Sequence, residues 1–166
     1  GDVYKRQVLD EELTRAMTPF SQKPGDVTAL RNRLQDVMWE DVGVMRDADG
    51  LQRGLKRIAE IDDELSSVGV AADNLAFNLS WHDWLNLRSL IDMSMVIAKA
   101  ALSRENSRGA HFREDFPDAG AMQESYFTLA SGYGDAISVT RAPVQFTIVK
   151  PGETVLGEDE AETLIK

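Results

Sequence analysis

The chain of 166 residues carries 28 acidic and 18 basic side chains, which gives a formal net charge of −10. This acidic balance argues against a nucleic-acid surface, because such a surface needs a basic patch. The sequence has no cysteine, so disulfides, thiolate nucleophiles and thiolate metal sites are excluded, and a reducing compartment is expected. No apolar run approaches the ~20 residues that cross a bilayer, so we expect no direct membrane insertion.

The first seven residues, GDVYKRQ, show neither an apolar period nor a helix-capping pattern. Residues 2–7 can be encoded by GAT GTG TAT AAG AGA CAG, which resembles the transposon-end adapter of sequencing libraries. We therefore interpret residues 1–7 as a translated scar, the alternative being a frayed natural terminus. On this interpretation residues 8–25 are the end of a preceding domain and a linker. They comprise a short amphipathic helix over residues 8–17 and a turn-rich segment, TPFSQKPGD.

Two amphipathic helices are expected between residues 26 and 69. Asp26 is a good N-cap for the first helix, and Asp47 or Asp49 can cap the second. The first apolar stripe is Val27, Leu30, Leu34, Val37, Met38, Val42 and Met45, and the second is Leu51, Leu55, Ile58, Ile61, Leu65 and Val68. Gly69 is the expected stop of the second helix.

A third helix is expected over residues 81–104. Ser80 followed by Asp83 resembles a capping box. Its apolar residues are Leu87, Leu90, Ile91, Met95, Ala98 and Leu102, with Met93, Ile97 and Ala101 beside them. So wide an apolar surface is typical of a helix buried on more than one side. Short connections between the three helices predict an antiparallel bundle over residues 26–116.

The apolar period changes from helical to alternating after Pro117. Phe127 and Leu129 alternate with other residues, as do Ile137 and Val139, and GYGD between the two runs is typical of a turn. We predict a β-hairpin whose apolar face packs on a larger body, within an extension over residues 117–150 that includes a further short strand in VQFTIV. Residues 151–166 are expected to form an acidic tail. The predicted fold class is mainly α: a three-helix antiparallel bundle (spectrin-repeat-like) followed by a C-terminal β-hairpin.

The stretch ALSRENSRGAHFREDFPD, residues 101–118, has seven charged residues and a histidine. One interpretation is a structural latch at the end of the third helix. Arg104 and Arg108 suit the negative end of the helix dipole. Arg113, Glu114 and Asp115 can form charge-assisted pairs with these arginines.

A second interpretation of this stretch is an anion or carboxylate site built from Arg108, His111 and Arg113. Residue types alone favour the latch. A Ser107–His111–Asp115 triad can also be drawn, but any acidic protein offers such a trio. His82 and His111 are the only histidines, and their spacing does not indicate a metal site.

The three tryptophans, Trp39, Trp81 and Trp84, could form a ligand-stacking surface. Such aromatic residues are more often core or interdomain packing, and in a fragment they can be the exposed side of a broken interface. The sequence contains no glycine-rich nucleotide-binding motif.

Two blocks resemble the flavoprotein subunits of succinate dehydrogenase and fumarate reductase. LQDVMWEDVGVMRDADGL, residues 34–51, is similar to a stretch of that family with a Met-Trp pair, Val-Gly, an Arg and Gly-Leu. IAKAALSRENSRGAHFREDFPD, residues 97–118, is similar to the family's alanine-rich helix, which ends in E-S-R-G-A-H and an acidic R-x-D-[FY] tail. YFTLASGYGDAISVTRAPV resembles the closing hairpin, so the resemblance covers about residues 30–144. One departure is Asn106, where the family usually has Glu.

The resemblance implies a division of labour. In that family FAD lies in an N-terminal dinucleotide-binding domain, which with a capping domain binds the dicarboxylate, and electrons leave through an iron–sulfur subunit. This chain looks like the C-terminal helical domain, so its implied partners are the missing flavin domain and an iron–sulfur subunit. The resemblance assigns no catalytic, cofactor-binding or metal residue to this chain, and FAD is implied for the full-length parent only. The structural or interface candidates are Trp39, Gly43, Arg46, Ser107, Arg108, Gly109, His111 and Arg113.

Two alternatives stay open beside this interpretation. The chain could be a stand-alone helical protein-interaction module, or the same domain from an L-aspartate oxidase, which shares this C-terminal region. The isolated chain is expected to be inactive. The expected location is cytoplasmic, peripheral to the inner membrane through partner subunits.

Overall fold

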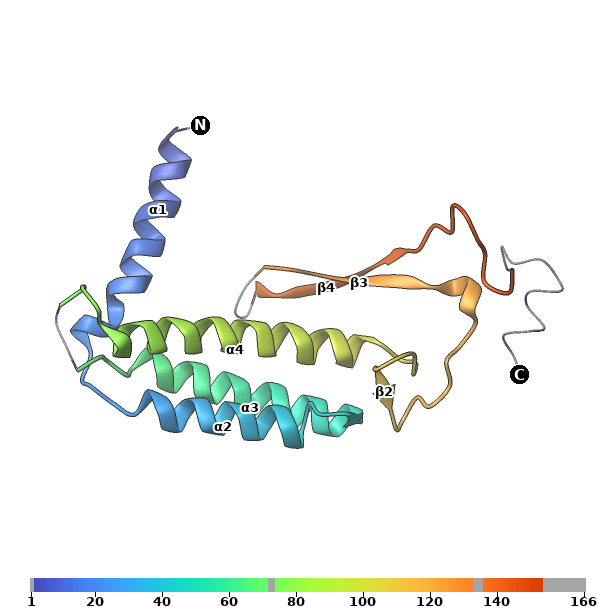
Figure 1. Ribbon diagram of the computed structural model, residues 1–166, viewed down its shortest axis with the longest axis horizontal. Helices are drawn as coiled ribbons and strands as arrows, with labels where there is room; N and C mark the ends of the chain where they lie inside the picture. The colour runs from blue at the N-terminus through green and yellow to red at the C-terminus, as the bar shows by residue number, and fades with distance from the viewer. Residues whose placement is uncertain (1, 72–73, 133–135, 154–166) are drawn as a thin grey trace.

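The computed structural model describes residues 2–71, 74–132 and 136–153, and this part of the chain is mainly helical with a C-terminal antiparallel strand pair (Figure 1). The predicted mainly α class and the C-terminal hairpin are therefore confirmed. In chain order the elements are α1 (Asp2–Met17), the 3-10 helix η1 (Thr18–Ser21), α2 (Val27–Glu40), β1 (Met45–Arg46), α3 (Ala48–Ser66), α4 (Leu79–Ser103), β2 (Phe112–Arg113), the 3-10 helix η2 (Met122–Glu124), β3 (Tyr126–Ser131) and β4 (Ser138–Pro143).

The helix starts are set by side-chain caps. Asp26 accepts a hydrogen bond from the Ala29 N–H, and Asp47 accepts one from the Gly50 N–H, as their positions predict. The predicted start of α4 was wrong, because Asn78 and not Ser80 is its N-cap. The Asn78 carboxamide accepts from the Trp81 N–H at 3.0 Å and from the Ser80 hydroxyl at 2.8 Å. Asparagine is among the best N-caps, so the helix begins two residues earlier.

The predicted role of Gly69 as a helix stop was also wrong. The helix α3 ends at Ser66, and its C-cap Ser67 keeps a right-handed backbone conformation. Gly69 serves another purpose, since a Cβ at this position would lie 2.1 Å from the Gln22 carbonyl oxygen. Its N–H donates to the Lys23 carbonyl at 2.9 Å. Glycine is therefore required for close approach of the two segments that enter α2 and leave α3.

The core lies where α2, α3 and α4 pack against one another along their lengths (Figure 1). All the members of this core are apolar: Val27, Leu30, Leu34, Val37, Val42, Leu51, Ile58, Ile61, Leu65, Val70, Trp84, Leu87, Ile91, Met95, Ala98, Ala101 and Ile137. The predicted stripes of the three helices supply most of them. Trp84 is anchored within this core by donating its indole N–H to the Val68 carbonyl at 2.9 Å.

One strip of α4 is exposed, although the sequence predicted a helix that is buried on more than one side. Leu90, Met93 and Ile97 are about half exposed, and Met93 reaches 56 %. In the described structure α4 contacts α2 and α3 on one side and the hairpin on another. The strip between these contacts has no covering element among the described residues.

The first helix is longer than predicted and stands apart from the others. It begins at Asp2 rather than near residue 8, and it points away from the packed helices (Figure 1). Its apolar residues Val8, Leu9 and Leu13 are exposed. The base of α1 is held by Trp81, whose indole N–H donates to the Ala16 carbonyl at 2.8 Å.

The hairpin pairs β3 with β4 in the register Tyr126↔Pro143 to Ser131↔Ser138. The predicted single apolar face was wrong. Phe127 and Leu129 are 58 % and 50 % exposed, whereas Val139, opposite Ala130, lies on the other face, which is partly buried. A period of two places residues on two faces but does not say which face is covered. Residues 133–135 of the predicted GYGD turn lie outside the described residues, as do residues 154–166 of the predicted tail.

The segment after the hairpin does not form the further strand expected in VQFTIV. The second strand ends at Pro143, and residues 144–149 are irregular. Proline lacks the N–H that a continuing strand pair requires. The hairpin itself is fixed to α4 through Ile137, which is buried in the core and accepts a hydrogen bond from the Lys99 ammonium at 3.2 Å.

Candidate functional site: a clasp at the helix ends

Arg113 is the centre of the charged stretch, and only 1 % of it is exposed. One of its terminal nitrogens, Nη1, donates to the carbonyls of Ala101, Leu102 and Arg104 at 3.1–3.2 Å. These carbonyls belong to the last turn of α4 and its C-cap, where helical N–H donors run out. Among them only Ala101 also accepts a backbone hydrogen bond that closes the helix end, from the Arg104 N–H at 3.2 Å. The positive guanidinium also matches the negative end of the helix dipole.

Asp115 completes this arrangement from the other side. Its carboxylate receives a two-point hydrogen bond from Nε and Nη2 of Arg113, at 2.7 and 2.6 Å. It also accepts from the Ala48 N–H, at the first turn of α3, at 2.9 Å. The hydrogen bonds from Arg113 hold the pKa of Asp115 down, to about 2, against a smaller opposing effect of burial. The Arg113–Asp115 pair therefore joins the C-terminal end of α4 to the N-terminal end of α3.

A short parallel strand pair runs beside this ion pair. β1 and β2 pair Met45 with Phe112 and Arg46 with Arg113, and the Glu114 N–H donates to the Arg46 carbonyl at 2.7 Å. The sequence blocks around residues 46 and 113, which are far apart in the chain, are thus neighbours in space. We call Arg46, Ser107, His111, Arg113 and Asp115 the clasp.

His111 links the two halves of the clasp. Its Nδ1 lies 3.0 Å from Nη1 of Arg46, and its Nε2 lies 3.4 Å from the Arg104 carbonyl. Because an arginine can only donate and a carbonyl can only accept, Nδ1 must be unprotonated and Nε2 must carry the proton. Arg46 itself donates Nε to the Val42 and Gly43 carbonyls just after α2.

The pKa of His111 is lowered below its ordinary value, chiefly because burial disfavours the imidazolium. The hydrogen bond to the Arg104 carbonyl works in the opposite direction, and the positive charges of Arg104, Arg46 and Arg113 lower the pKa further. Both the hydrogen-bond geometry and the electrostatics thus favour the neutral imidazole.

Ser107 and Gly109 shape the loop that carries the clasp. The Ser107 hydroxyl donates to the Phe116 carbonyl at 2.8 Å and accepts from the Arg113 N–H at 2.9 Å. Gly109 has a φ of +58°, within a tight turn in which Arg108 and His111 exchange backbone hydrogen bonds. The left-handed conformation favours glycine.

Arg108 does not meet the helix end as the latch interpretation expected. It donates to the carbonyls of Ala119 and Ala121 and to the Ser125 hydroxyl, the last at 2.9 Å. It therefore orders the segment that leads to the hairpin, and Arg113 is the residue on the α4 carbonyls. The three residues of the anion-site interpretation do not converge on a common ligand position. His111 and Arg113 both contact the Arg104 carbonyl, whereas the Arg108 guanidinium is directed to Ala119, Ala121 and Ser125. Likewise Ser107, His111 and Asp115 are not hydrogen-bonded to one another.

Asn106 is buried beside the clasp, with 8 % exposed, and its Oδ1 accepts no hydrogen bond from the residues that the structure describes. The resemblance placed a Glu at this position in the family. A buried acceptor without a donor is unusual.

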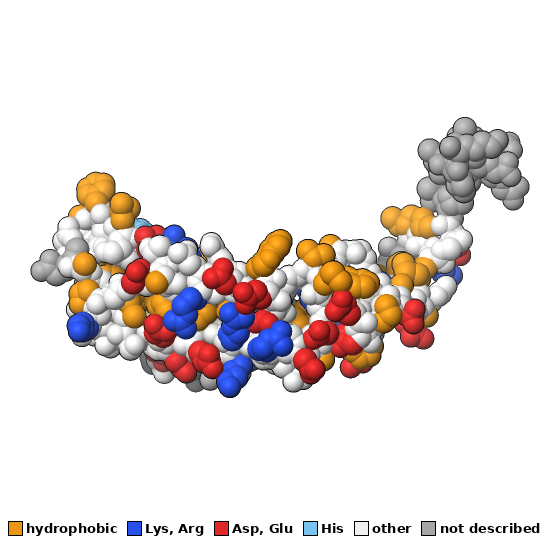
Figure 2. Space-filling model, turned by 90° about the horizontal axis from the view of Figure 1, so that it is seen from below, with side chains coloured by type: hydrophobic (Ala, Val, Ile, Leu, Met, Phe, Trp, Pro, Cys, Tyr) orange, Lys and Arg blue, Asp and Glu red, His pale blue; other side chains and the backbone are white. Residues whose placement is uncertain are grey.

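The tryptophans separate into two kinds. Trp84 is buried and Trp81 packs edge-on against Phe20, whereas Trp39 is 80 % exposed. Trp39 is accompanied by exposed Val44 and Met45, and Phe112 is paired with Met45. We call Trp39, Val44, Met45 and Phe112 the apolar patch. Figure 2 shows apolar side chains gathered beside a band of Lys, Arg, Asp and Glu side chains on one face.

Gly43 holds the backbone below this patch. A Cβ on Gly43 would lie 2.4 Å from the Trp39 carbonyl oxygen, so no other residue fits without a backbone shift. The turn that follows α2 is therefore tight, and it sets both the exposed indole of Trp39 and the start of β1.

One arrangement was missed by the sequence interpretation. The Tyr126 ring lies under two guanidinium groups, with Cζ of Arg141 at 4.6 Å and Cζ of Arg104 at 5.5 Å from its centroid. No spacing in the sequence signals this contact, because the three residues come from three different segments.

The clasp does not fit FAD. Its arginines direct most of their N–H groups to backbone carbonyls and to Asp115, and the described part of the chain has only two-stranded sheets. Among these residues no group of three His, Asp or Glu side chains is placed to hold a metal ion. No helix in the described ranges is long and apolar enough to cross a membrane.

The fold and the clasp define a helical domain that ends in a hairpin, and comparison with known proteins gives its family. Residues 31–156 match the family described as fumarate reductase flavoprotein C-term. The chain belongs to this family, the C-terminal domain of succinate dehydrogenase and fumarate reductase flavoproteins. The resemblance noted in the sequence is thereby confirmed.

Three relatives illustrate the range of the family. The chain is 32 % identical over 111 residues to an uncharacterised FAD-dependent oxidoreductase of Methanocaldococcus jannaschii, covering 66 % of this chain and 20 % of the relative. It is 32 % identical over 131 residues to the succinate dehydrogenase flavoprotein subunit of Rickettsia conorii, covering 76 % and 22 %. It is 38 % identical over 86 residues to L-aspartate oxidase 1 of Ralstonia nicotianae, covering 52 % and 15 %.

The fold agrees with a solved structure of the family. Sdh1 of Mycobacterium smegmatis in complex with UQ1 matches with a TM-score of 0.75 and 28 % identity, over 87 % of this chain and 25 % of that one. The chain thus spans about a fifth of the length of the first of these curated relatives and a quarter of the solved chain.

Proposed function

We propose that the chain supports the flavin domain of a longer FAD-dependent flavoprotein that interconverts succinate and fumarate. Family membership supports this proposal, as do the flavoprotein relatives, which are four to five times longer than the matched part. Catalysis and FAD binding then belong to the rest of the parent protein, and the 166-residue chain alone is inactive.

The structural role rests on α2, α3 and α4 acting as one rigid three-helix antiparallel bundle of the spectrin-repeat type. The clasp strengthens this body, because Arg113 and Asp115 tie the ends of α3 and α4 together. Arg46 and His111 add the segment after α2. A rigid body of this kind can present a fixed surface to a neighbouring domain.

The apolar patch carries the proposal, since it is the surface that a flavin domain would cover. Trp39 is 80 % exposed although Gly43 and the start of β1 hold its surroundings in place. A large aromatic side chain on a rigid support is typical of a protein interface. An iron–sulfur subunit is a second partner, and the parent protein is then peripheral to the inner membrane through its partner subunits.

Co-purification tests the interface. The flavin domain encoded upstream in the parent gene is expressed with this chain, and with the variants Trp39→Ser and Leu129→Ser. We expect Trp39→Ser to reduce complex formation at least tenfold, whereas Leu129→Ser, which removes an apolar side chain from the exposed face of the hairpin, leaves it unchanged. An equal effect of the two variants would contradict the assignment of the patch.

The upstream reading frame separates the alternatives. A dinucleotide-binding domain with succinate-linked activity would support the flavoprotein parent, whereas L-aspartate oxidation would identify the related member of the family. If no such domain precedes this region, and the purified chain is monomeric without exposed apolar surface by dye binding, the chain is a stand-alone interaction module.

A further inference from the structure

The loop that leads into α4 carries three apolar side chains that are exposed to solvent. Phe77 is 99 % exposed, Leu79 is 76 % exposed and Leu75 is 53 % exposed. A single exposed apolar residue needs no explanation, but three within five positions of one loop form a surface that is typical of an interaction site. We call Leu75, Phe77 and Leu79 the apolar finger.

Phe77 is held in an unfavourable backbone conformation. Its φ is +58°, and no other non-glycine residue in the described part of the chain has a positive φ. A bulky side chain rarely adopts this left-handed conformation, so the backbone here is strained. The next residue, Asn78, fixes the loop, because its buried carboxamide donates to the Asn74 carbonyl at 2.9 Å and accepts from the Trp81 N–H. Strain that the surrounding structure maintains at an exposed ring is typical of a functional surface.

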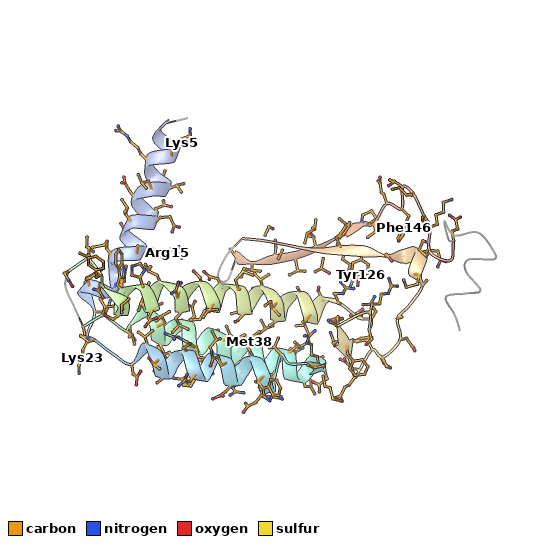
Figure 3. All side chains as sticks on the ribbon, viewed as in Figure 1. Lys5, Arg15, Lys23, Met38, Tyr126 and Phe146 are labelled. Atoms are coloured by element: carbon orange, nitrogen blue, oxygen red, sulfur yellow. The ribbon has the colours of Figure 1, made fainter. Side chains whose placement is uncertain are left out.

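The apolar finger lies beside the base of α1. Trp81, two positions after Leu79, donates its indole N–H to the Ala16 carbonyl at 2.8 Å. Figure 1 shows the loop that leads into α4 next to the base of α1, and Figure 3 places Arg15 and Lys23 at this end of the molecule. The apolar residues of α1 are also exposed: Val8, Leu9, Leu13 and Met17. The finger therefore continues the apolar surface of α1.

The sequence around the finger favours a protein partner over a lipid surface. Residues 70–87 contain no Lys or Arg, whereas apolar side chains that bind membranes are ordinarily accompanied by cations that attract anionic lipids. The chain spans only about a fifth to a quarter of its relatives, and the proposed function assigns the preceding part of the parent to a flavin domain. Because α1 rises beside the finger, the flavin domain is the large body that can cover both.

We propose that the apolar finger inserts Phe77 into an apolar pocket of the flavin domain, as a second contact separate from the apolar patch. This inference rests on the proposed function. The finger lies where α4 begins, and the patch lies where α4 ends, beside β1 and β2 (Figure 1). The 25 residues of α4 separate the two surfaces by about 37 Å.

One flavin domain is large enough to touch both surfaces. A globular body of about 400 residues has a radius of gyration of about 21 Å, so its diameter exceeds the length of α4. A single contact would attach the helical body to this domain, whereas two distant contacts also fix its orientation. The finger is therefore expected to position the three-helix body, and the patch to hold its other end.

Co-purification with the flavin domain tests the finger. Phe77→Ser is compared with Phe127→Ser, the same substitution at a ring that is 58 % exposed on the hairpin. We expect Phe77→Ser to reduce complex formation at least tenfold and Phe127→Ser to leave it unchanged. If Trp39→Ser weakens the complex and Phe77→Ser does not, the finger inference is wrong and the proposed function stands. If the parent sequence forms no complex, the proposed function fails and the finger loses its partner.

Phe77→Gly separates binding from folding. Glycine adopts a φ of +58° without strain, and the ring that it removes is exposed. We therefore expect the midpoint of thermal unfolding of the isolated chain not to fall, while complex formation falls at least tenfold. A lower midpoint together with unchanged complex formation would give Phe77 a structural role and overturn the proposal.

Two measurements on the isolated chain test other occupants of the finger. Flotation with vesicles of phosphatidylcholine and phosphatidylglycerol measures lipid binding, and sedimentation velocity measures self-association. We expect neither to differ between the parent sequence and Phe77→Ser. Lipid binding that requires Phe77 would make the finger a membrane contact, and dimers that require Phe77 would make a second copy its partner. Either result would contradict docking on the flavin domain.

Discussion

Nη1 of Arg46 lies 3.0 Å from Nδ1 of His111, and this contact requires a neutral imidazole. The relationship joins the segment after α2 to the loop after α4, and it gives the clasp a sensitivity to pH. A proton on Nδ1 would remove the acceptor and place an imidazolium beside Arg46, Arg104 and Arg113. Asp115, the acid on this side, is already paired with Arg113.

His111 is therefore predicted to destabilise the chain when the pH falls. Its folded pKa is lowered, so its stabilising effect is complete above the unfolded value of about 6.5 and is lost as the pH falls from there toward the folded pKa. Urea unfolding between pH 7.5 and 5 measures the slope, and NMR titration of the ring measures the pKa. We expect the dependence of the free energy of unfolding on pH to be weaker in His111→Gln and unchanged in the control variant His82→Gln. A His111 that titrates at 6.5 or above would refute the tautomer assignment.

Arg113→Met should cost the most stability of any single change in the clasp. The variant removes the guanidinium hydrogen bonds to the α4 carbonyls and the two-point hydrogen bond to the Asp115 carboxylate, so we expect a loss of about 3–5 kcal/mol in the free energy of unfolding. Arg33→Met, which breaks an exposed pair with Glu64, should cost under about 1 kcal/mol. Chemical denaturation of both variants provides the comparison, and equal losses would show that Arg113 does not hold the helix ends.

Asp115→Asn should change the response to acid. The folded pKa of Asp115 is about 2 against an ordinary 3.8, so its stabilising effect is complete above about pH 4 and is lost as the pH falls toward 2. The Asn variant is less stable at pH 7, and its stability falls less between pH 4 and 3 than that of the parent sequence. Asp36→Asn, on an exposed position of α2, is the control. An unchanged acid response in Asp115→Asn would remove Asp115 from the clasp.

Gly43→Ala tests the tight turn below Trp39. The added Cβ meets a backbone oxygen at 2.4 Å, so the backbone must move, and we expect a loss of about 1–3 kcal/mol. Gly25→Ala meets only methyl groups of Val68, at 3.1 Å, and should cost less because that side chain can rotate. Thermal unfolding of the two variants gives the comparison. A smaller loss of stability in Gly43→Ala than in Gly25→Ala would mean that the turn is not tight.

Several features could be predicted from the sequence because they depend on local patterns. The spacing of Leu51, Ile58 and Leu65 defined the buried face of α3, and Asp26 and Asp47 marked helix starts. Charge at the end of α4 predicted a latch. The sequence alone could not show which arginine reaches the α4 carbonyls. Arg108 and Arg113 fit the negative end of the helix dipole equally well, and the structure places Arg113 there.

Other features depend on contacts that no local pattern reveals. Arg46 and His111 are 65 positions apart, and the contact of Tyr126 with Arg104 and Arg141 joins three segments. The alternation in β3 was read correctly, but the covered face proved to be the one that contains Tyr126 and Thr128, because α4 lies beneath it. Burial of that face depends on tertiary packing, and the apolar pair Phe127 and Leu129 was consequently misplaced.

The contacts between the β1 and β2 regions join distant parts of the chain and therefore affect the order in which the protein folds. Ala48 and Asp115 meet across 67 positions, and closing a loop of that length costs a flexible chain roughly 4 kcal/mol of entropy. The helices α2, α3 and α4 form mainly from local contacts, so their packing shortens this loop before the clasp closes. Substitutions at Arg113 should then accelerate unfolding while leaving the refolding rate nearly unchanged, and the completed clasp would act chiefly as a kinetic barrier to opening.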